Sequence, residues 1–396
     1  MKNPRDIVKN LLNDQNPEDE ICAYDAQNWR VSSASVATSE SPIRAENCNS
    51  ETVFNIASIS KTFAAATILK MTEDERFAHL FSSEVENKID TPIQNFIPYL
   101  KSRYPDSDYI QTGLEAEKNF DEITIAHLLN HSSGIGEFDR DGFRKLAFES
   151  PESLAREPDG KFFTVARKIY NEGENKPEFG KYFYSDLGYE LLGMIIAATS
   201  SQALGRKATC GETIKELIIR PLGLEHSFTQ DEMTYDEDGK VKVVDRPDIE
   251  VAQGYDSNDG KAHPSLVFRR CIATSGIYST PSDICKFADA FFSNKKRVEG
   301  GLFDNPKTIE MRDSRPVITK KDEFYAAGYE AYQDRDGSLV KLHGAFTQGF
   351  FGWMGYKNGQ SACCLVSCVN NSIAPTPEIT NSAVTELRTK TLGKGK

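Results

Sequence analysis

A serine and a lysine three positions apart, Ser58 and Lys61, are the residues in this sequence best suited to do chemistry together. Side chains at this spacing lie on one face of a helix, about one turn apart. A serine hydroxyl is a weak nucleophile until a base takes its proton. A lysine can be that base if burial and the positive end of a helix dipole keep its amine neutral. The spacing therefore predicts a compact nucleophile–base pair.

The same spacing also has a purely structural explanation, in which Ser58 caps a helix and Lys61 is a solvated residue of its first turn. It occurs again at Ser293 and Lys296, in a polar segment predicted to be a loop. The residues from Lys61 to Lys70, however, are rich in alanine and poor in polar groups, which predicts a buried helix. A lysine beside a buried helix needs a reason to be there, and this favours the catalytic interpretation.

A tyrosine is the next candidate. Tyr184 directly precedes an apolar segment, residues 189–199, that is predicted to be a buried helix. On its own, a tyrosine here is more often a structural ring with a solvated hydroxyl. Near Lys61, its phenol could shuttle the serine proton, because tyrosine and lysine have similar unperturbed pKa values.

A histidine on a predicted strand is the last candidate. His343 is followed by Gly344 and Ala345, and small residues there would let a substrate backbone approach the strand closely. On its own, His343 could equally be a half-buried strand residue. If the strand lies beside the serine, the backbone N–H groups of Ser58 and Phe346 could form an oxyanion hole.

Other kinds of catalytic centre find little support in the sequence. It contains no Gly-x-Ser-x-Gly motif, so a nucleophile elbow is not expected. Its six histidines form no His-x-His or His-Glu-x-x-His pattern, and none of its eight cysteines shows Cys-x-x-Cys spacing. We therefore expect no metal and no cofactor. Cys363, Cys364 and Cys368 lie in an apolar run and are predicted to be core thiols.

Composition limits the partners of the 396-residue chain. Its 59 acidic and 47 basic residues give a net charge of −12, which argues against nucleic acid or an anionic membrane surface. No apolar run is long enough to span a bilayer. The N-terminal residues lack the apolar core of a secretory signal, which predicts a cytoplasmic protein with reduced thiols. A small molecule or short peptide is the expected substrate, and the oligomeric state is not predicted.

The pattern of elements predicts an α+β fold in which strands from both ends of the chain form one antiparallel sheet. Strands are predicted at 20–26, 29–38, 324–333, 338–343, 350–356 and 361–369, and an acidic hairpin or lid at about 230–262. Helices are predicted at 58–73, 124–130, 165–170, 189–199, 213–219 and 280–292, and near both termini (around Ile7 to Leu12 and Ile379 to Leu387). We expect a sheet lobe of residues 1–75 and 266–396, flanked by the terminal helices, and a helical inserted lobe of residues 76–265.

Taken together and in order, these segments resemble the serine hydrolases related to class C β-lactamases and D-alanyl-D-alanine carboxypeptidases, which are penicillin-binding-protein-like. In that family Ser-x-x-Lys, Tyr-x-Asn and Lys/His-x-Gly motifs line one cleft. Residues 58–61 match the first motif, 184–186 match the second except at Asp186, and 343–345 match the third except at Ala345. Segments 123–135, 221–224 and 275–283 also resemble the family, and the likeness covers roughly residues 5 to 390.

The resemblance implies a β-lactamase/transpeptidase-like fold and an acyl-enzyme on Ser58, with Lys61 and Tyr184 receiving its proton and His343 supporting the cleft electrostatically. Substrates would be amides, peptides with a D-residue, β-lactams or esters. Asp186, if ionised, can only accept hydrogen bonds, so it suits an amine or Lys61 and repels a carboxylate. Ala345 adds a methyl at the cleft wall. Two alternatives stay open: an esterase or acyltransferase, and a catalytically silent binding or assembly module.

Overall fold

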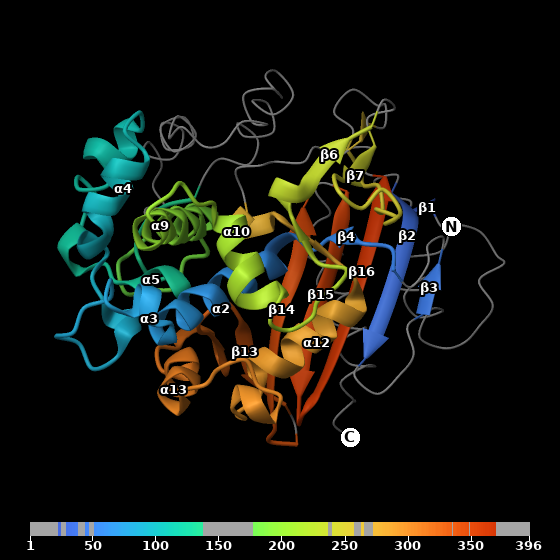
Figure 1. The fold of residues 1–396 in the computed structure, drawn as a ribbon. Helices are drawn as coiled ribbons and strands as arrows, with labels where there is room; N and C mark the ends of the chain where they lie inside the picture. The colour runs from blue at the N-terminus through green and yellow to red at the C-terminus, as the bar shows by residue number, and fades with distance from the viewer. Residues whose placement is uncertain are drawn as a thin grey trace.

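The structure is a computed structural model of the whole chain. It describes residues 23–24, 29–38, 44–46, 51–137, 177–236, 240–256, 263–264, 272–334, 336–347 and 349–369. The two predicted terminal helices and the predicted helix at 165–170 lie outside the described residues. Within the described ranges the chain has mixed α+β content, with a large sheet on one side and most helices on the other (Figure 1).

The main sheet runs in the order β1-β2-β16-β15-β14-β13-β12-β11, with every pair along this path antiparallel. Its strands are β1 (Ala23–Tyr24), β2 (Trp29–Thr38), β11 (Val317–Lys320), β12 (Glu323–Tyr325), β13 (Glu330–Gln333), β14 (Leu339–Thr347), β15 (Phe350–Lys357) and β16 (Gln360–Val369). Off this path, β3 (Arg44–Glu46) pairs with β2. Strand β8 (Tyr255–Asp256) pairs with β16 in parallel and with β9 (His263–Pro264).

Strands from opposite ends of the chain meet at the pairing of β2 with β16. Thr38 lies opposite Ala362, and Arg30 lies opposite Val369. Figure 1 shows the blue strand β2 beside the red strand β16. Because β16 continues through β15 into β14, this pairing fixes β14 relative to the N-terminal part of the chain.

Strand β14 has partners on both sides over only part of its length. β13 pairs with residues 339–342, whereas β15 pairs with β14 as far as Thr347. From His343 onward the edge toward β13 therefore has no strand partner among the described residues. The short 3₁₀ turn η2 (Ala57–Ile59) packs against β14 and β15. In a β-strand successive residues direct their backbone groups to alternate edges, so every second residue from His343 onward presents its N–H and C=O groups to the open edge.

Helix α2 (Ser60–Glu73) follows η2 directly and is buried on almost every side, Lys61 included. It packs against α9 (Asp186–Leu204) and α11 (Ile272–Ser275), while α12 (Pro281–Phe292) covers β2, β15 and β16. Other helices are α3 (Glu75–Ala78), α4 (Ile97–Arg103), α5 (Ile125–Leu129), α10 (Cys210–Ile214) and α13 (Pro306–Asp313), with 3₁₀ or π turns η3 (Lys88–Asp90), η4 (Ile93–Phe96), η5 (Tyr109–Gly113), η6 (Phe120–Glu122), η7 (Lys215–Ile219), η8 (Gln230–Glu232) and η9 (Arg297–Glu299).

Two small sheets complete the described architecture. One has the order β4-β10-β5 and consists of β4 (Phe54–Asn55), β10 (Ile277–Ser279) and β5 (Phe228–Thr229). The other is the hairpin of β6 (Met233–Tyr235) and β7 (Val241–Val243), at the place where a surface hairpin was predicted. Strand β4 leads straight into η2, so β4-β10-β5 anchors the backbone just before Ser58.

The prediction of one strand over residues 324–333 is wrong, because two strands, β12 and β13, form a hairpin there. The turn contains Gly328 at φ +76°, and a Cβ on this glycine would lie 2.7 Å from the Cβ of Ala65 on α2. Thr62 Oγ donates a hydrogen bond to the Gly328 carbonyl at 2.6 Å. Contact with α2, which is distant in sequence, sets the position of this turn.

The cysteines follow the expected pattern where they are described. Cys210, Cys285 and Cys363 are buried free thiols, and Cys363 lies on β16 as its apolar surroundings predict. In the described part of the chain, no helix combines the length and the apolar character needed to cross a lipid bilayer.

Candidate active site

Ser58 lies inside η2 rather than at the start of a helix. The N-cap of α2 is Ile59, so the interpretation of Ser58 as a helix cap is wrong. The preceding residue, Ala57, has φ +46°, a left-handed conformation that costs a residue with a side chain about 1 kcal/mol or more. Asn55 holds this conformation by accepting a hydrogen bond from the Ala57 N–H at 2.7 Å. A strained residue thus fixes the direction of the serine beside it.

The Ser58 N–H is available for a ligand. The neighbouring N–H groups donate to protein atoms: that of Ala57 to Asn55 Oδ1, and that of Ile59 to the Ile56 carbonyl at 3.1 Å. For the Ser58 N–H, the described residues provide no acceptor. A free N–H next to a serine hydroxyl is the kind of donor that an oxyanion hole needs.

Lys61 is fully buried and has three close acceptors. Its Nζ atom lies 3.1 Å from Ser58 Oγ, 2.5 Å from a carboxylate oxygen of Asp186 and 3.4 Å from the Thr274 carbonyl oxygen. An ammonium group has three N–H donors, which matches this set of acceptors. The structure therefore brings Ser58, Lys61 and Asp186 together from η2, α2 and the first turn of α9.

The charge state of Lys61 differs from the neutral amine that the sequence suggested. Burial lowers the pKa of Lys61, but the carboxylate of Asp186 outweighs this effect, so the pKa lies above its ordinary value. Lys61 is consequently an ammonium ion at neutral pH, paired with Asp186. The prediction of a base kept neutral by burial and a helix dipole is wrong for the resting site, because it left out this counter-ion.

Tyr184 lies against the same lysine. Lys61 Nζ is 4.9 Å from the centre of the Tyr184 ring. Removal from water raises the pKa of Tyr184, while the charge of Lys61 and hydrogen bonds with Lys61 and Ser58 act in the opposite direction. The phenol therefore keeps its proton at neutral pH. It is close enough to both partners to give that proton up during a reaction.

His131 holds Tyr184 in place and was not identified from the sequence. Its Nδ1 accepts a hydrogen bond from the Ser185 N–H at 3.0 Å, and its ring centre lies 4.3 Å from that of Tyr184. Burial holds the pKa of His131 well below its usual value, so the ring is neutral and Nδ1 is free to accept. The available signal was its position after a short predicted helix, which indicated a helix end and nothing more.

His343 is buried rather than half-buried. Its Nδ1 lies 2.7 Å from the Gly344 carbonyl oxygen and its Nε2 lies 2.9 Å from the Tyr325 hydroxyl. Burial and the nearby charge of Lys61 lower its pKa to about 3. The ring is therefore neutral, donates from Nδ1 and accepts at Nε2. A neutral ring brings no positive charge to the cleft, which corrects the expected electrostatic role.

The residues after His343 lie on alternate faces of β14. Gly344 faces open space, since a Cβ added to it would meet no atom within 4 Å. Phe346, two residues on, shares that face and is half-buried. Ala345 shares the face of His343 and is 3% exposed within the core. Its methyl group is therefore buried, and the expectation that it narrows the cleft wall is wrong.

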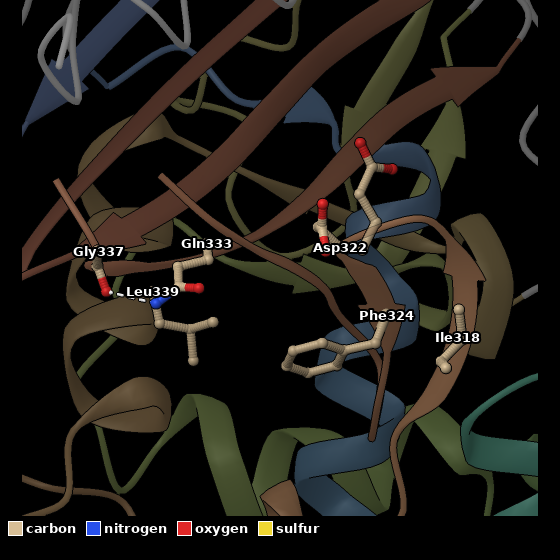
Figure 2. Close-up of a pocket in the computed structure, with 7 residues that line it drawn as sticks. Ile318, Asp322, Phe324, Gln333, Gly337 and Leu339 are labelled. Atoms are coloured by element: carbon tan, nitrogen blue, oxygen red, sulfur yellow. Dashed lines mark hydrogen bonds between the residues drawn. The ribbon is translucent and has the colours of Figure 1, made fainter. Parts of the chain in front are cut away.

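A separate surface hollow of about 390 Å³ lies at the β11–β14 edge of the sheet. Figure 2 shows the Phe324 ring and the Leu339 side chain pointing into it, with Asp322 at its upper rim. None of its lining residues is a predicted site residue. The hollow is distinct from the Ser58 site and has no part in the chemistry proposed below.

The family model described as Beta-lactamase matches residues 21–374. The chain belongs to the beta-lactamase family. The chain is similar to the Escherichia coli (strain K12) protein called "Putative D-alanyl-D-alanine carboxypeptidase", with 22% identity over 337 residues, 80% of this chain and 67% of that protein. The family as a whole is related to D-Ala-D-Ala carboxypeptidases, penicillin-binding proteins and D-amino acid amidases.

Several solved structures have a fold similar to that of this chain. The D-stereospecific amidohydrolase from Streptomyces sp. has a TM-score of 0.63 at 18% identity, covering 89% of this chain and 94% of its own. The D-amino acid amidase from Ochrobactrum anthropi SV3, solved with L-phenylalanine amide, has a TM-score of 0.57 at 19% identity, covering 90% and 92%. These similarities support a β-lactamase/transpeptidase-like fold.

Proposed function

We propose that the protein is a serine hydrolase that works through a covalent acyl-enzyme on Ser58. The observation that carries this proposal is the 3.1 Å contact between Ser58 Oγ and Lys61 Nζ, beside a strand whose edge is open from His343 onward. A substrate placed along that edge would present its carbonyl carbon to Ser58. The free N–H of Ser58 and the N–H of Phe346 would hold the carbonyl oxygen as it becomes negative.

The proton steps follow from the charges of the resting site. Ser58 Oγ attacks the carbonyl carbon, and its proton passes to Lys61 as Lys61 passes one of its own to Asp186. Tyr184 then donates its phenolic proton to the leaving group as the bond to that group breaks. The proton held by Asp186 returns through Lys61 to the Tyr184 oxygen, which restores the starting charges. Water releases the acyl group by the same route in reverse.

The substrate class is proposed from the neighbours of Ser58. The acid at position 186 is already paired with Lys61, so it offers no attraction to a substrate carboxylate. Both Lys61 and Tyr184 hold protons, which suits an amine leaving group that must be protonated. We therefore place amides and short peptides first, including those with a D-residue, followed by β-lactams and esters. The solved relatives act on amides, according to their names.

The organisation of the chain enters the proposal as well. We take residues 1–75 and 266–396 as a sheet lobe and residues 76–265 as an inserted, mostly helical lobe. Ser58 and Lys61 then come from the first lobe, while Tyr184 and Asp186 come from the second. A site built this way would depend on how the two parts of the chain pack, and the ion pair of Lys61 with Asp186 would join them.

A second candidate function is favoured by the same ion pair. If Asp186 keeps Lys61 protonated throughout, Ser58 is never activated and the fold serves as a silent binding or assembly module. An esterase or acyltransferase that spares amides is an intermediate case, in which Ser58 reacts with esters alone. An ester leaving group needs less help from a proton donor than an amine does. These candidates differ in whether Ser58 reacts and with which leaving group.

Intact-mass analysis after incubation with a fluorophosphonate or a penicillin tests the proposal. We expect one adduct on the wild type and none on Ser58→Ala. Ser293→Ala is a matched control, because Ser293 is followed by Lys296 at the same spacing, and it should label like the wild type. An unlabelled wild type, or equal labelling of Ser58→Ala, would contradict the proposal. Rates on a p-nitrophenyl ester and a D-alanyl anilide then separate esterase from amidase.

A further inference from the structure

A buried carboxylic acid, Glu190, lies behind the Ser58 site. It follows Asp186 by four residues on α9, so the two side chains share one face of the helix. Glu190 is 5% exposed, in a helix whose other inward-facing residues are almost all apolar. Acidic residues are rarely buried to this extent without a partner. Neither the sequence motifs nor the proposed proton steps give Glu190 a role.

Thr274 connects Glu190 to the lysine. Its hydroxyl donates a hydrogen bond to Glu190 Oε1 at 2.7 Å, and its carbonyl oxygen lies 3.4 Å from Lys61 Nζ. Thr274 belongs to α11, which packs against both α2 and α9. One residue therefore contacts the carboxyl group with its side chain and the ammonium group with its backbone.

The electrostatic surroundings of Glu190 are simple. The titratable groups that interact with it are Lys61 on α2, Asp186 on its own helix and the thiol of Cys210 on α10. Burial raises the pKa of Glu190 to about 8, and the hydrogen bond from Thr274 opposes that rise. Burial also raises the pKa of Cys210 well above its usual value, so the thiol is neutral. At neutral pH the cluster thus holds one positive charge, on Lys61, and one negative charge, on Asp186.

We propose that Glu190 is a positioning residue of the Ser58 site. Through Thr274 it holds the Lys61 ammonium against Ser58, and the charge on its carboxyl group controls how readily the Lys61–Asp186 pair exchanges a proton. This inference rests on the proposed function of Ser58 as a nucleophile. It adds a residue that touches neither substrate nor reacting atoms and acts only through Thr274 and Lys61.

Loss of the Glu190 proton would place a second negative charge beside Lys61. The proton on Lys61 would then be held more tightly, and the negative charge that develops on the substrate carbonyl would be opposed. Both effects slow the attack of Ser58. We therefore expect the rate of fluorophosphonate labelling to fall by up to about tenfold between pH 7 and pH 9, the limit that a single ionisation near pH 8 sets.

Two substitutions test this assignment. Glu190→Gln keeps the shape of the side chain and an acceptor for Thr274 but cannot ionise, so the fall in labelling between pH 7 and pH 9 should disappear. Thr274→Val removes the hydroxyl that stabilises the ionised carboxyl group, so the fall should move to higher pH. Glu310→Gln, at an exposed position of α13, is the matched control and should keep the wild-type profile.

The outcomes separate this inference from the proposed function. A wild type that does not label at any pH overturns the proposed function itself. A wild type that labels but shows no inflection near pH 8, or a Glu190→Gln variant that keeps the inflection, overturns only the role of Glu190. If Glu190→Gln does not fold, the direction of the shift in Thr274→Val decides: an inflection that stays in place or moves to lower pH overturns the assignment.

Discussion

Lys61 Nζ lies 2.5 Å from a carboxylate oxygen of Asp186, closer than the 3.1 Å that separates it from Ser58 Oγ. The strongest partner of the candidate base is thus an acid, at the position where the resembling family has an amide. Asp186 comes from the first turn of α9 and Lys61 from the first turn of α2, so the pair also joins two buried helices. The charges on Lys61 and Asp186 therefore decide whether Lys61 can take the Ser58 proton.

Replacing the acid with the amide, Asp186→Asn, should convert Lys61 into the neutral base expected from the sequence. Without the carboxylate, burial prevails and the pKa of Lys61 falls, so Lys61 can take the Ser58 proton directly. A fall of one unit changes the neutral fraction about tenfold, so we expect labelling at pH 7 to rise by about that factor or more. The labelling rate of the variant should also rise with pH where Lys61 loses its proton, in a range where Lys61 of the wild type stays protonated. Labelling rates between pH 5 and pH 10 measure both effects.

The matched control for this substitution is Asp313→Asn. Asp313 also pairs with a lysine, Lys341, at 3.0 Å, on the part of β14 that pairs with β13 and not on its open edge. Its substitution should leave the pH profile of labelling unchanged. An Asp186→Asn variant that labels more slowly than the wild type at every pH would show that the pKa of Lys61 does not fall far enough for Lys61 to replace Asp186 as the acceptor of the Ser58 proton.

Stability should decrease as the pH falls below about 6.5, and His343 should account for part of the decrease. Burial, together with the charge of Lys61, lowers the pKa of His343 to about 3 in the folded protein, below its ordinary value of 6.5. Between these values the unfolded chain binds more protons than the folded one. Stability is therefore complete above pH 6.5 and is lost as the pH falls toward 3. Burial likewise lowers the pKa values of His127 and His131, which act in the same direction.

Urea unfolding at pH 7, 6, 5 and 4 measures this dependence. His343→Gln should lose stability less steeply toward low pH than the wild type, whatever its stability at pH 7. His79→Gln, at a surface position, is the matched control and should follow the wild-type slope. Parallel slopes for His343→Gln and the wild type would mean that His343 does not carry the difference in proton binding.

The turn at Gly328 should tolerate no side chain. Gly328→Ala would place a Cβ 2.7 Å from the Ala65 Cβ and 3.0 Å from the Lys61 carbonyl oxygen, in a left-handed conformation. The conformation costs about 1 kcal/mol, and overpacking against α2 adds about 1–3 kcal/mol. Because Lys61 lies in the part of α2 that the added Cβ would contact, labelling of Ser58 should slow as well. The free energy of unfolding and the labelling rate are the two measurements.

Gly337→Ala separates the cost of the left-handed conformation from the cost of overpacking against α2. Gly337 has nearly the same φ, +80°, but the nearest atom to an added Cβ is Gln333 Nε2 at 4.0 Å. This substitution should show the conformational cost alone and leave labelling unchanged. Equal losses of stability in the two variants would show that the contact with α2 contributes nothing.

Much of the fold could be predicted because the signals are local. Thr280 and Pro281 mark the start of α12, and the structure shows Thr280 accepting a hydrogen bond from the Asp283 N–H at 3.2 Å. The turn at Asn358 and Gly359 joins β15 and β16, with both residues at positive φ, as this hairpin pair predicts. Strand β11 and the break at Gly328 were missed, because contacts with distant residues decide them.

In the candidate site, too, contacts between residues close in sequence could be predicted and contacts between distant residues could not. Ser58 and Lys61 are three residues apart, so the sequence could suggest their contact. Only the family resemblance suggested Asp186 as a partner of Lys61, because the two residues are more than a hundred positions apart and no local pattern joins them. The link through Thr274 was not predicted. For His343 the sequence predicted a strand position near the site. Its burial and its charge state could not be predicted, because they depend on Tyr325 and on the place of β14 in the sheet.

The pairing of β2 with β16 has a consequence for synthesis. While a ribosome is still producing the chain, β2 emerges early and must wait for nearly all the remaining residues before its main partner exists. Until then its edge, and later that of β15, is open to association with other nascent chains. We expect premature termination before residue 360 to leave a product that aggregates, and factors that shield nascent chains to raise the yield of intact protein.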